Sequence, residues 1–343
     1  MPRWGFSMSP ELTTAVERPG PSTLSVSISR FLRQGLVPIL LLAELIFFTL
    51  AAPGFLATGN LGNILVNAAD IGLVAAGVTL VVLVGGIDVS VGNMVGVVAW
   101  VAVSLATSGM PLPVVLIAAI VLAALLGAVN GSLVALGKVP AIIATLGMAA
   151  IYRMVLFLLW DKTDLFTGPL MPWLGPQSRI GPIPTVALVT LGVFILLAWM
   201  LRYTVFGRRL YAIGNDPESA RLLGVPVART VLIAYVIVGV LVSFAAIIYS
   251  GRLGVIQANA GNDLTLPAIA AVLLGGTSIL GGSGGVLKTL TGLAFIVVLQ
   301  NGIVLLGVPS LLSGVMVGSA LILAVATDVL TRRVLDAKRR ITK

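Results

Sequence analysis

Long apolar runs recur along almost the whole chain, and they decide which solvent it folds in. Stretches of about 17 to 25 mostly apolar residues, each long enough to cross a bilayer as a helix, follow one another from Leu36 almost to Arg332. Only 10% of the 343 residues are charged, against about 25% in soluble domains. The sequence therefore predicts an all-α polytopic membrane protein that leaves no room for a sizeable soluble domain.

We expect about ten transmembrane helices, of which the third and the eighth are short or interrupted. Residues 1–35, rich in Ser, Pro and Thr, are predicted to be a flexible cytoplasmic tail. Residues 36–330 are predicted to form the membrane domain, with a cytoplasmic loop at 203–229, and residues 331–343 a basic cytoplasmic tail. The predicted spans are residues 36–55, 64–84, 92–107, 113–136, 141–160, 183–202, 230–249, 264–274, 286–306 and 311–328.

The basic residues lie between and beyond the apolar runs. Sixteen of the 21 Lys and Arg residues fall in the N-terminal tail, at Lys138, in the loop from Arg202 to Arg229, or in the C-terminal tail. Because cytoplasmic loops of membrane proteins are enriched in Lys and Arg, this asymmetry predicts cytoplasmic N- and C-termini. No basic face interleaved with aromatic residues is present, so we expect no nucleic-acid partner.

Residues that carry chemistry are scarce. The chain has no Cys and no His, which removes disulfides, thiolate chemistry, imidazole metal ligands and Ser-His nucleophile systems. The segment "GGSGGVLKTL" is close to a phosphate-binding loop, but Leu287 occupies the place of the second required glycine. We therefore expect no catalytic residue, no metal site and no cofactor bound by this chain, and we do not expect an enzyme.

Polar residues interrupt the apolar runs most clearly at "GGIDVSVGN", residues 85–93. Asp88 and Ser90 fit a helix start, where side-chain oxygens accept from unpaired backbone N–H groups. They equally fit a break that lines a solute path, because irregular backbone at membrane depth is tolerated only against protein or water. For the intramembrane acids Asp70 and Glu44 we expect a structural role only: each lies near enough to a span end or a neighbouring helix for its carboxylate to find a hydrogen-bond partner.

A weak internal repeat supports the path hypothesis. "GGIDVSVGN" is matched loosely by "GGTSILGGS" at residues 275–283, and "NGSLVALGKVP" at Asn130 by "NGIVLLGVP" at Asn301. Glycine-interrupted segments at corresponding places in two halves point to a transport site, although interhelical hydrogen bonding is the alternative for the asparagines. The candidate path residues are Asp88, Ser90, Asn93, Asn130, Gly275, Gly276 and Asn301.

The segment "GNDPESARLLGV", residues 214–225, predicts a short helix outside the membrane. Asp216 is a good N-cap, Pro217 occupies the first helical position, Glu218 lies in the first turn, and Gly224 ends the helix. Such a helix suits a groove on a partner protein, or it is an ordinary capped connection.

Several motifs taken together resemble the permease subunits of monosaccharide ABC importers, of the ribose, xylose, arabinose, galactose and rhamnose type. They are "GGIDVSVGNMVG", "VPAIIATLGMAAIYR", "YAIGNDPESARLLGV", "QANAGNDLTLPAIAAVLLGGTSILGGSGG" and "LQNGIVLLGV", and the resemblance extends from about Leu36 to Arg333. The order and spacing of the motifs match as well. One departure is that the family often has Glu where this chain has Thr265, with Pro267 in the next variable place.

The resemblance implies a bacterial inner-membrane permease that imports a monosaccharide or a similar small neutral polyhydroxy solute by alternating access. It implies a cytoplasmic ABC ATPase that binds ATP and Mg, an extracytoplasmic solute-binding protein, and a second permease copy or a paralogue. Import of autoinducer-2 by the same mechanism and passive facilitation stay open as alternatives. By the same resemblance the residues that couple to the ATPase are Asn215, Asp216, Pro217, Glu218, Ser219, Ala220, Arg221, Leu222 and Gly224.

Overall fold

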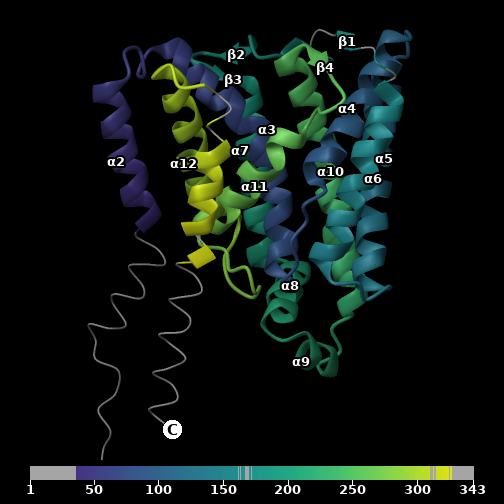
Figure 1. Ribbon diagram of the computed structural model, residues 1–343. Helices are drawn as coiled ribbons and strands as arrows, with labels where there is room; N and C mark the ends of the chain where they lie inside the picture. Colours follow the sequence, from purple (N-terminus) through teal and green to yellow (C-terminus); the bar gives the residue numbers. More distant parts are fainter. Residues whose placement is uncertain are drawn as a thin grey trace, which may run out of the picture.

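The computed structural model describes residues 36–160, 162, 164–166, 170, 172–309, 312, 314–323 and 325–326. Helices make up most of this part of the chain, which confirms the predicted all-α membrane fold (Figure 1). The two predicted terminal tails, residues 1–35 and 331–343, lie outside the described residues.

Each of the ten predicted spans contains an apolar helix. Six of these helices are long and apolar enough to cross a bilayer: α3 (Thr58–Leu83), α5 (Leu112–Ala135), α6 (Ala141–Trp160), α7 (Thr185–Tyr203), α10 (Val227–Leu253) and α12 (Val286–Leu305). The other four are shorter: α2 (Leu36–Ala51), α4 (Val91–Thr107), α11 (Asn262–Leu274) and the helix Gly314–Leu323.

Two of the helix ends that differ from the prediction have a clear local cause. Helix α3 begins six residues before the predicted start, because the polar Asn60 in its first turn is satisfied by the Phe55 carbonyl and by Asn301. Helix α10 extends to Leu253 and ends at Gly254, whose φ of 69° provides the left-handed conformation typical of a helix C-terminus.

Short elements lie at the two ends of the bundle. At one end α8 (Val205–Asn215) and α9 (Pro217–Leu222) project beyond the long helices (Figure 1). The opposite end carries two antiparallel strand pairs and a 3-10 turn. They are β1 (Leu165–Phe166) with β4 (Val255–Ile256), β2 (Arg179–Ile180) with β3 (Ile183–Pro184), and η1 (Pro172–Leu174).

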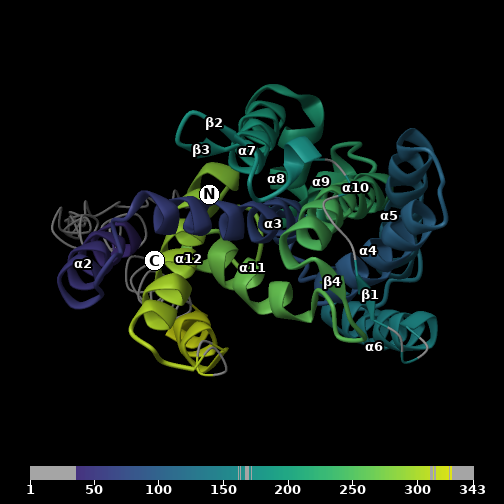
Figure 2. The same ribbon diagram turned by 90° about the horizontal axis from the view of Figure 1, so that it is seen from above.

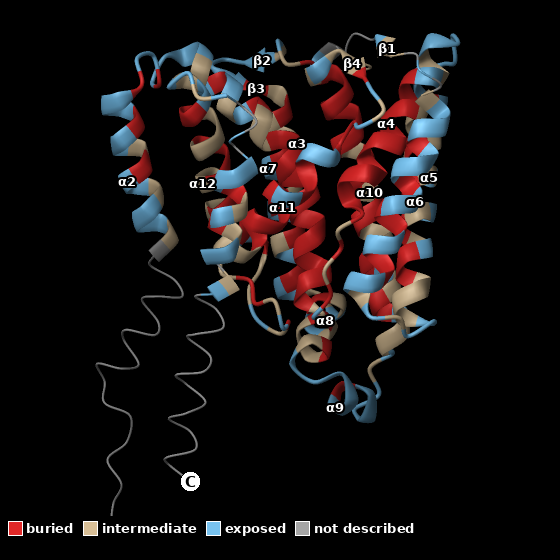
Figure 3. Cartoon of the chain, in the orientation of Figure 1, coloured by how far each residue is buried: buried red, intermediate tan, exposed pale blue. Residues whose placement is uncertain are grey.

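Helices α3 and α10 form the centre of the bundle, with α5 and α6 on one side and α2 on the other (Figure 2). In the most apolar window of each helix, 78% of α3 but only 22% of α5 is buried, so α5 faces outward (Figure 3). Glycines bring α5 and α10 into backbone contact: a Cβ on Gly239 would lie 2.1 Å from the Ala123 carbonyl oxygen. Small residues at such contacts are the usual way in which membrane helices pack closely.

Candidate functional site

The chain between α3 and α4 is not helical, as the sequence predicted for a broken segment. A left-handed Gly85 (φ 81°) turns the chain at the end of α3, and α4 starts only at Val91. The hydroxyl of Thr145 on α6 satisfies the backbone of the break: it donates to the Ile87 carbonyl (3.0 Å) and accepts the Val89 N–H (3.2 Å). The irregular backbone is therefore held by protein at membrane depth.

Asp88 lies in this break and is fully buried. Its carboxylate accepts from the Ser90 N–H (2.9 Å), the Ser90 hydroxyl (2.6 Å) and the Asn130 amide (3.5 Å). The Asn130 amide also donates to the Ser90 Oγ (2.7 Å), and its carbonyl oxygen accepts from the Tyr152 hydroxyl (2.9 Å). The structure thus brings three predicted site residues together. Asp88 accepts the N–H of Ser90, the residue before α4, but neither Asp88 nor Ser90 accepts an N–H within α4 through its side chain, so the predicted capping of this helix was wrong. Tyr152 and Thr145 were not predicted.

Helices α4 and α11 begin beside each other. A Cβ on Gly92 would lie 2.4 Å from the Gly261 carbonyl oxygen, and the Gly92 N–H donates to the Thr265 hydroxyl (3.2 Å). From this meeting point α4 runs toward the end of the bundle where α5 starts, and α11 toward the end that carries α8 (Figure 1). Thr265, the residue that departs from the family pattern, therefore accepts a backbone N–H from the first turn of α4.

A second glycine-rich break separates α11 from α12 and touches the first. The Gly282 N–H donates to the Leu83 carbonyl (3.0 Å), and a Cβ on Gly281 would lie 2.7 Å from the Gly85 nitrogen. Gly275 fits α11 against α12, because its Cβ would lie 2.3 Å from the Lys288 carbonyl oxygen. Gly276 adopts a φ of 86° in the turn that follows. The repeated segments 85–93 and 275–283 thus meet in space.

Helix α8, which the sequence did not predict, packs against both breaks. A Cβ on Gly214 would lie 1.9 Å from the Leu83 carbonyl oxygen and 2.3 Å from the Gly282 nitrogen. The Tyr211 hydroxyl donates to the Gly284 carbonyl (3.1 Å). The Asn215 amide donates to the Tyr211 carbonyl (2.9 Å), which anchors the end of α8.

Helix α9 has the predicted cap. The Asp216 carboxylate accepts the N–H groups of Glu218 (3.0 Å) and Ser219 (3.2 Å) and the Ser219 hydroxyl (2.5 Å). The hydrogen bonds from Ser219 and Glu218 lower the pKa of Asp216 below its usual value. Pro217 occupies the first position, and Gly224 (φ 80°) follows the helix.

The two faces of α9 differ in exposure. Ala220 is buried, whereas Leu222 and Leu223 are 83% and 84% exposed. Glu218 and Arg221 form an exposed ion pair. Two adjacent leucines at the tip of a rigidly capped projection are available to another protein.

Two cavities lie on either side of the Asp88 break. One, of about 760 Å³, lies between α9 and the bundle; Gly85, Gly86 and Tyr235 line it. The other, of about 630 Å³, is lined by Asn93 of α4 together with residues of α6 and of the segment leading into α11. Asp88 and Ser90, between the two, are buried.

Asn301 lies apart from this cluster. Its side chain and that of Asn60 exchange two hydrogen bonds of 2.9 Å, which join α12 to α3. The structure therefore places Asn301 in an interhelical contact.

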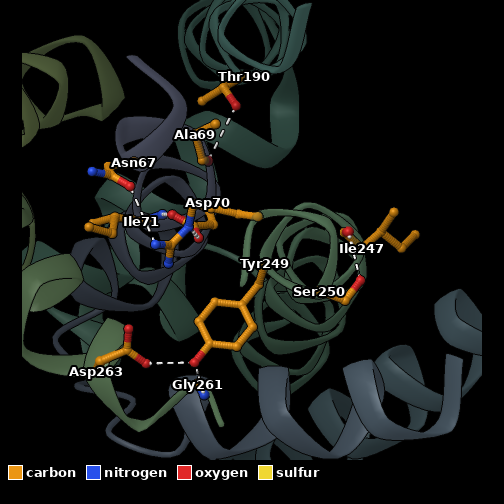
Figure 4. Close-up of polar contacts among 11 residues, drawn as sticks. Asn67, Ala69, Asp70, Ile71, Thr190, Ile247, Tyr249, Ser250, Gly261 and Asp263 are labelled. Atoms are coloured by element: carbon orange, nitrogen blue, oxygen red, sulfur yellow. Dashed lines mark hydrogen bonds and ion pairs between the residues drawn. The ribbon is translucent and has the colours of Figure 1, made fainter. Parts of the chain in front are cut away.

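Asp70 is satisfied as expected. The Arg252 Nε donates to its Oδ2 (2.8 Å), and the Ile71 N–H donates to its Oδ1 (2.8 Å), as Figure 4 shows for the acid and its surroundings. For Glu44 the expectation was wrong: within the described part of the chain its buried carboxylate oxygens have no hydrogen-bond partner. The reason is that α2 packs on α12 through apolar side chains such as Phe48 and Val298.

The chain has clear relatives among known proteins. Residues 60–325 match the family described as branched-chain amino acid transport system / permease component. Ribose import permease protein RbsC of Escherichia coli K12 is 37% identical over 302 residues, covering 86% of this chain and 93% of the relative. The probable ABC transporter permease protein YphD of the same strain is 36% identical over 338 residues, 95% of this chain and 100% of the relative.

Autoinducer 2 import system permease protein LsrC of Shigella flexneri is 34% identical over 307 residues, 88% of this chain and 89% of the relative. No solved structure matches the chain significantly. The broken membrane helices, the projecting capped helix and these matches agree, and the chain belongs to this family of permease components, as a homologue of the ribose and autoinducer-2 import permeases.

Proposed function

We propose that the protein is the permease subunit of an ATP-binding-cassette importer that moves a monosaccharide or a similar small neutral polyhydroxy solute into the cytoplasm. The observation that carries this proposal is α9, a short helix capped by Asp216 that projects from the bundle and exposes Leu222 and Leu223. A projection of this kind suits insertion into a groove of a partner ATPase. ATP and Mg are bound and hydrolysed on that partner.

The contacts of α8 support a route for the coupling. Movement of α9 acts on α8 through Asn215 and Asp216, and Gly214 of α8 lies directly against Leu83 and Gly282. These contacts reach both glycine-rich breaks without an intervening side chain. A shift of α8 therefore changes the positions of the segments that lead into α4 and α12.

The two cavities support alternating access. Gly85 and Gly86 line the cavity beside α9, and Asn93 lines the cavity on the far side of the break. Hydrogen bonds among the buried Asp88, Ser90 and Asn130 hold the segment that connects Gly86 of the first lining to Asn93 of the second. We propose that rearrangement of this break opens the path to one side at a time.

The membrane setting and partners follow the same proposal. Bacterial relatives and six long apolar helices indicate a multi-pass protein of the bacterial inner membrane. The concentration of Lys and Arg near α8, α9 and both termini supports a cytoplasmic location for them. The outward, apolar face of α5 and α6 leaves room for lipid and for a second permease copy or a paralogue, and a solute-binding protein delivers the solute from outside.

The proposal is tested with Leu222→Asp combined with Leu223→Asp. Because both side chains are exposed, the variant keeps the fold, but we expect it to lose binding of the partner ATPase in detergent. The control is Leu125→Asp, at a position on α5 that is also exposed (59%) but remote from α9. Retention of ATPase binding by the double variant would contradict the proposed role of α9.

A second candidate is import of autoinducer-2, which the identity to LsrC favours. The two candidates share the mechanism and differ in the solute. Mass spectrometry of the ligand carried by the solute-binding protein that stimulates this permease separates them. A sugar supports the first candidate, and autoinducer-2 supports the second.

A further inference from the structure

The cavity on the far side of the Asp88 break combines side chains from three parts of the chain. Asn93 comes from the first turn of α4, and Arg153 and Phe157 come from α6. Asn259 comes from the segment that leads into α11, and Asn262 is the first residue of α11. Of these only Asn93 was predicted. The cavity is open on one side and has a volume of about 630 Å³, enough for a solute of the size of a monosaccharide with water.

Arg153 is out of place for a residue that faces lipid. It lies well inside α6, a helix long and apolar enough to span the membrane, and its side chain is exposed. Within the described ranges it makes no ion pair and no hydrogen bond through its side chain. Because a charged side chain at this depth is costly in hydrocarbon, Arg153 faces water or a polar ligand.

The side chains of the three asparagines are also available to form hydrogen bonds with a ligand. Their side-chain amides make no hydrogen bond to any other residue that the structure describes. An amide both donates and accepts, and the guanidinium donates through a planar fork of N–H groups. Hydroxyl groups of a polyol both donate and accept, so this set can satisfy several of them at once.

The remaining wall suits a sugar ring. Phe157 and Met154 expose apolar surface to the cavity, against which the C–H face of a ring can pack. No carboxylate lines the cavity, so nothing there calls for a cationic solute.

The cavity also lies where two helices begin. Asn93 is in the first turn of α4 and Asn262 is the first residue of α11, and the starts of these helices touch through Gly92 and Gly261. Helices that begin within the membrane beside a cavity are a recurrent way of building transport sites. Position and chemistry therefore agree.

We infer that Asn93, Arg153, Asn259 and Asn262 form a water-accessible binding site for the hydroxyl groups of a neutral polyol in the membrane domain. The identity of the solute rests on the proposed function, whereas the access of water to the site does not.

The test uses the absence of cysteine from the chain. Single variants Asn93→Cys and Asn262→Cys are assembled with the partner ATPase in liposomes and exposed to a charged, membrane-impermeant methanethiosulfonate reagent. The matched control is Ile151→Cys, which is exposed on α6 two residues from Arg153 and therefore about 200° around the helix. We expect the two cavity variants to react at least about tenfold faster than the control. Equal rates would overturn the site.

The same assay tests which ligands bind, because a bound ligand should protect the introduced cysteine from labelling. With the solute-binding protein present, a mixture of ribose, xylose, arabinose, galactose and rhamnose should slow the labelling of Asn93→Cys. The protection should disappear when Arg153→Met is added. Failure of all five sugars to protect, or full protection with Arg153→Met, would overturn the assignment to a polyol. Fast labelling that ATP does not change supports the site and contradicts the ATP-driven importer.

Discussion

Replacement of Arg252 by Met tests the energetics of the one ion pair with a buried acid that the described part of the chain contains. Arg252 Nε lies 2.8 Å from Asp70 Oδ2, and the acid is 0% exposed while the arginine side chain is 19% exposed. Arg252 also donates to Asn67 (3.3 Å) and lies over the Tyr249 ring, which is labelled with Asp70 in Figure 4. Removing it leaves a buried carboxylate with only the Ile71 N–H as partner.

Breaking a buried pair on one side costs about 3–5 kcal/mol. Because Arg252 is partly exposed, water can reach the vacated position, and we expect the lower end, about 3 kcal/mol. This corresponds to a change of roughly a hundredfold in the unfolding equilibrium. The double variant Asp70→Asn with Arg252→Met removes both charges and should recover most of the loss, since no uncompensated charge remains.

The assay is unfolding in mixed micelles by titration with sodium dodecyl sulfate, followed by circular dichroism of the helices. A matched control is Arg202→Met, at the end of α7, where the arginine contacts the Tyr203 ring and no acid. If Arg252→Met costs less than about 1 kcal/mol, or if its effect adds to that of Asp70→Asn, the reasoning that the pair neutralises a buried charge is wrong.

Three further predictions concern the site and α9. Gly214→Ala should reduce solute uptake by liposomes at least about tenfold, because the added Cβ would lie 1.9 Å from the Leu83 carbonyl oxygen. The control Gly147→Ala, where the added Cβ would have no atom within 4 Å, should leave uptake unchanged. Tyr152→Phe should lower the free energy of unfolding by about 1–2 kcal/mol, because it removes hydrogen bonds to Leu126 and Asn130; the detergent titration measures it. Hydrogen exchange of the α9 amides should accelerate in Asp216→Ala and stay near the parent rate in Asp216→Asn, since Asn is an equally good cap. Because the pKa of Asp216 is lowered in the fold, the stabilisation by its charge is present above the unfolded value and is lost as the pH falls through the folded value, so the parent and Asp216→Asn should differ in their response to acid.

Sequence patterns predicted the features that depend on local chemistry. Apolar length located the helices, and the order Asp216, Pro217 and Gly224 predicted both the start and the end of α9, because capping uses residues close together in the chain. The glycines around Asp88 predicted the break for the same reason. Helix α8 was missed because its arginines and glycines interrupt the apolar pattern, although Thr204 caps it by accepting the Gly207 N–H (3.2 Å).

The residues of other helices that contact the Asp88 break could not be predicted from local sequence. Thr145 and Tyr152 are single polar residues in an apolar helix, and nothing in their neighbourhood of sequence indicates that they meet Ile87 and Asn130. Arg153 gave a stronger signal, since an arginine inside a span is rare, but which residues it faces is a property of the packed helices. Contacts between distant segments, such as Leu83 with Gly282, likewise exist only in the folded bundle.

The most direct test of the account is solute uptake by liposomes that contain the permease and its ATPase, with the solute-binding protein added. The solute is a radiolabelled form of the ligand that was identified in that binding protein. We predict that uptake requires ATP and that Glu218→Ala combined with Arg221→Ala, at the exposed ion pair of α9, abolishes it. Uptake at the same rate without ATP, or undiminished in the double variant, would contradict the claim that α9 couples this permease to ATP hydrolysis.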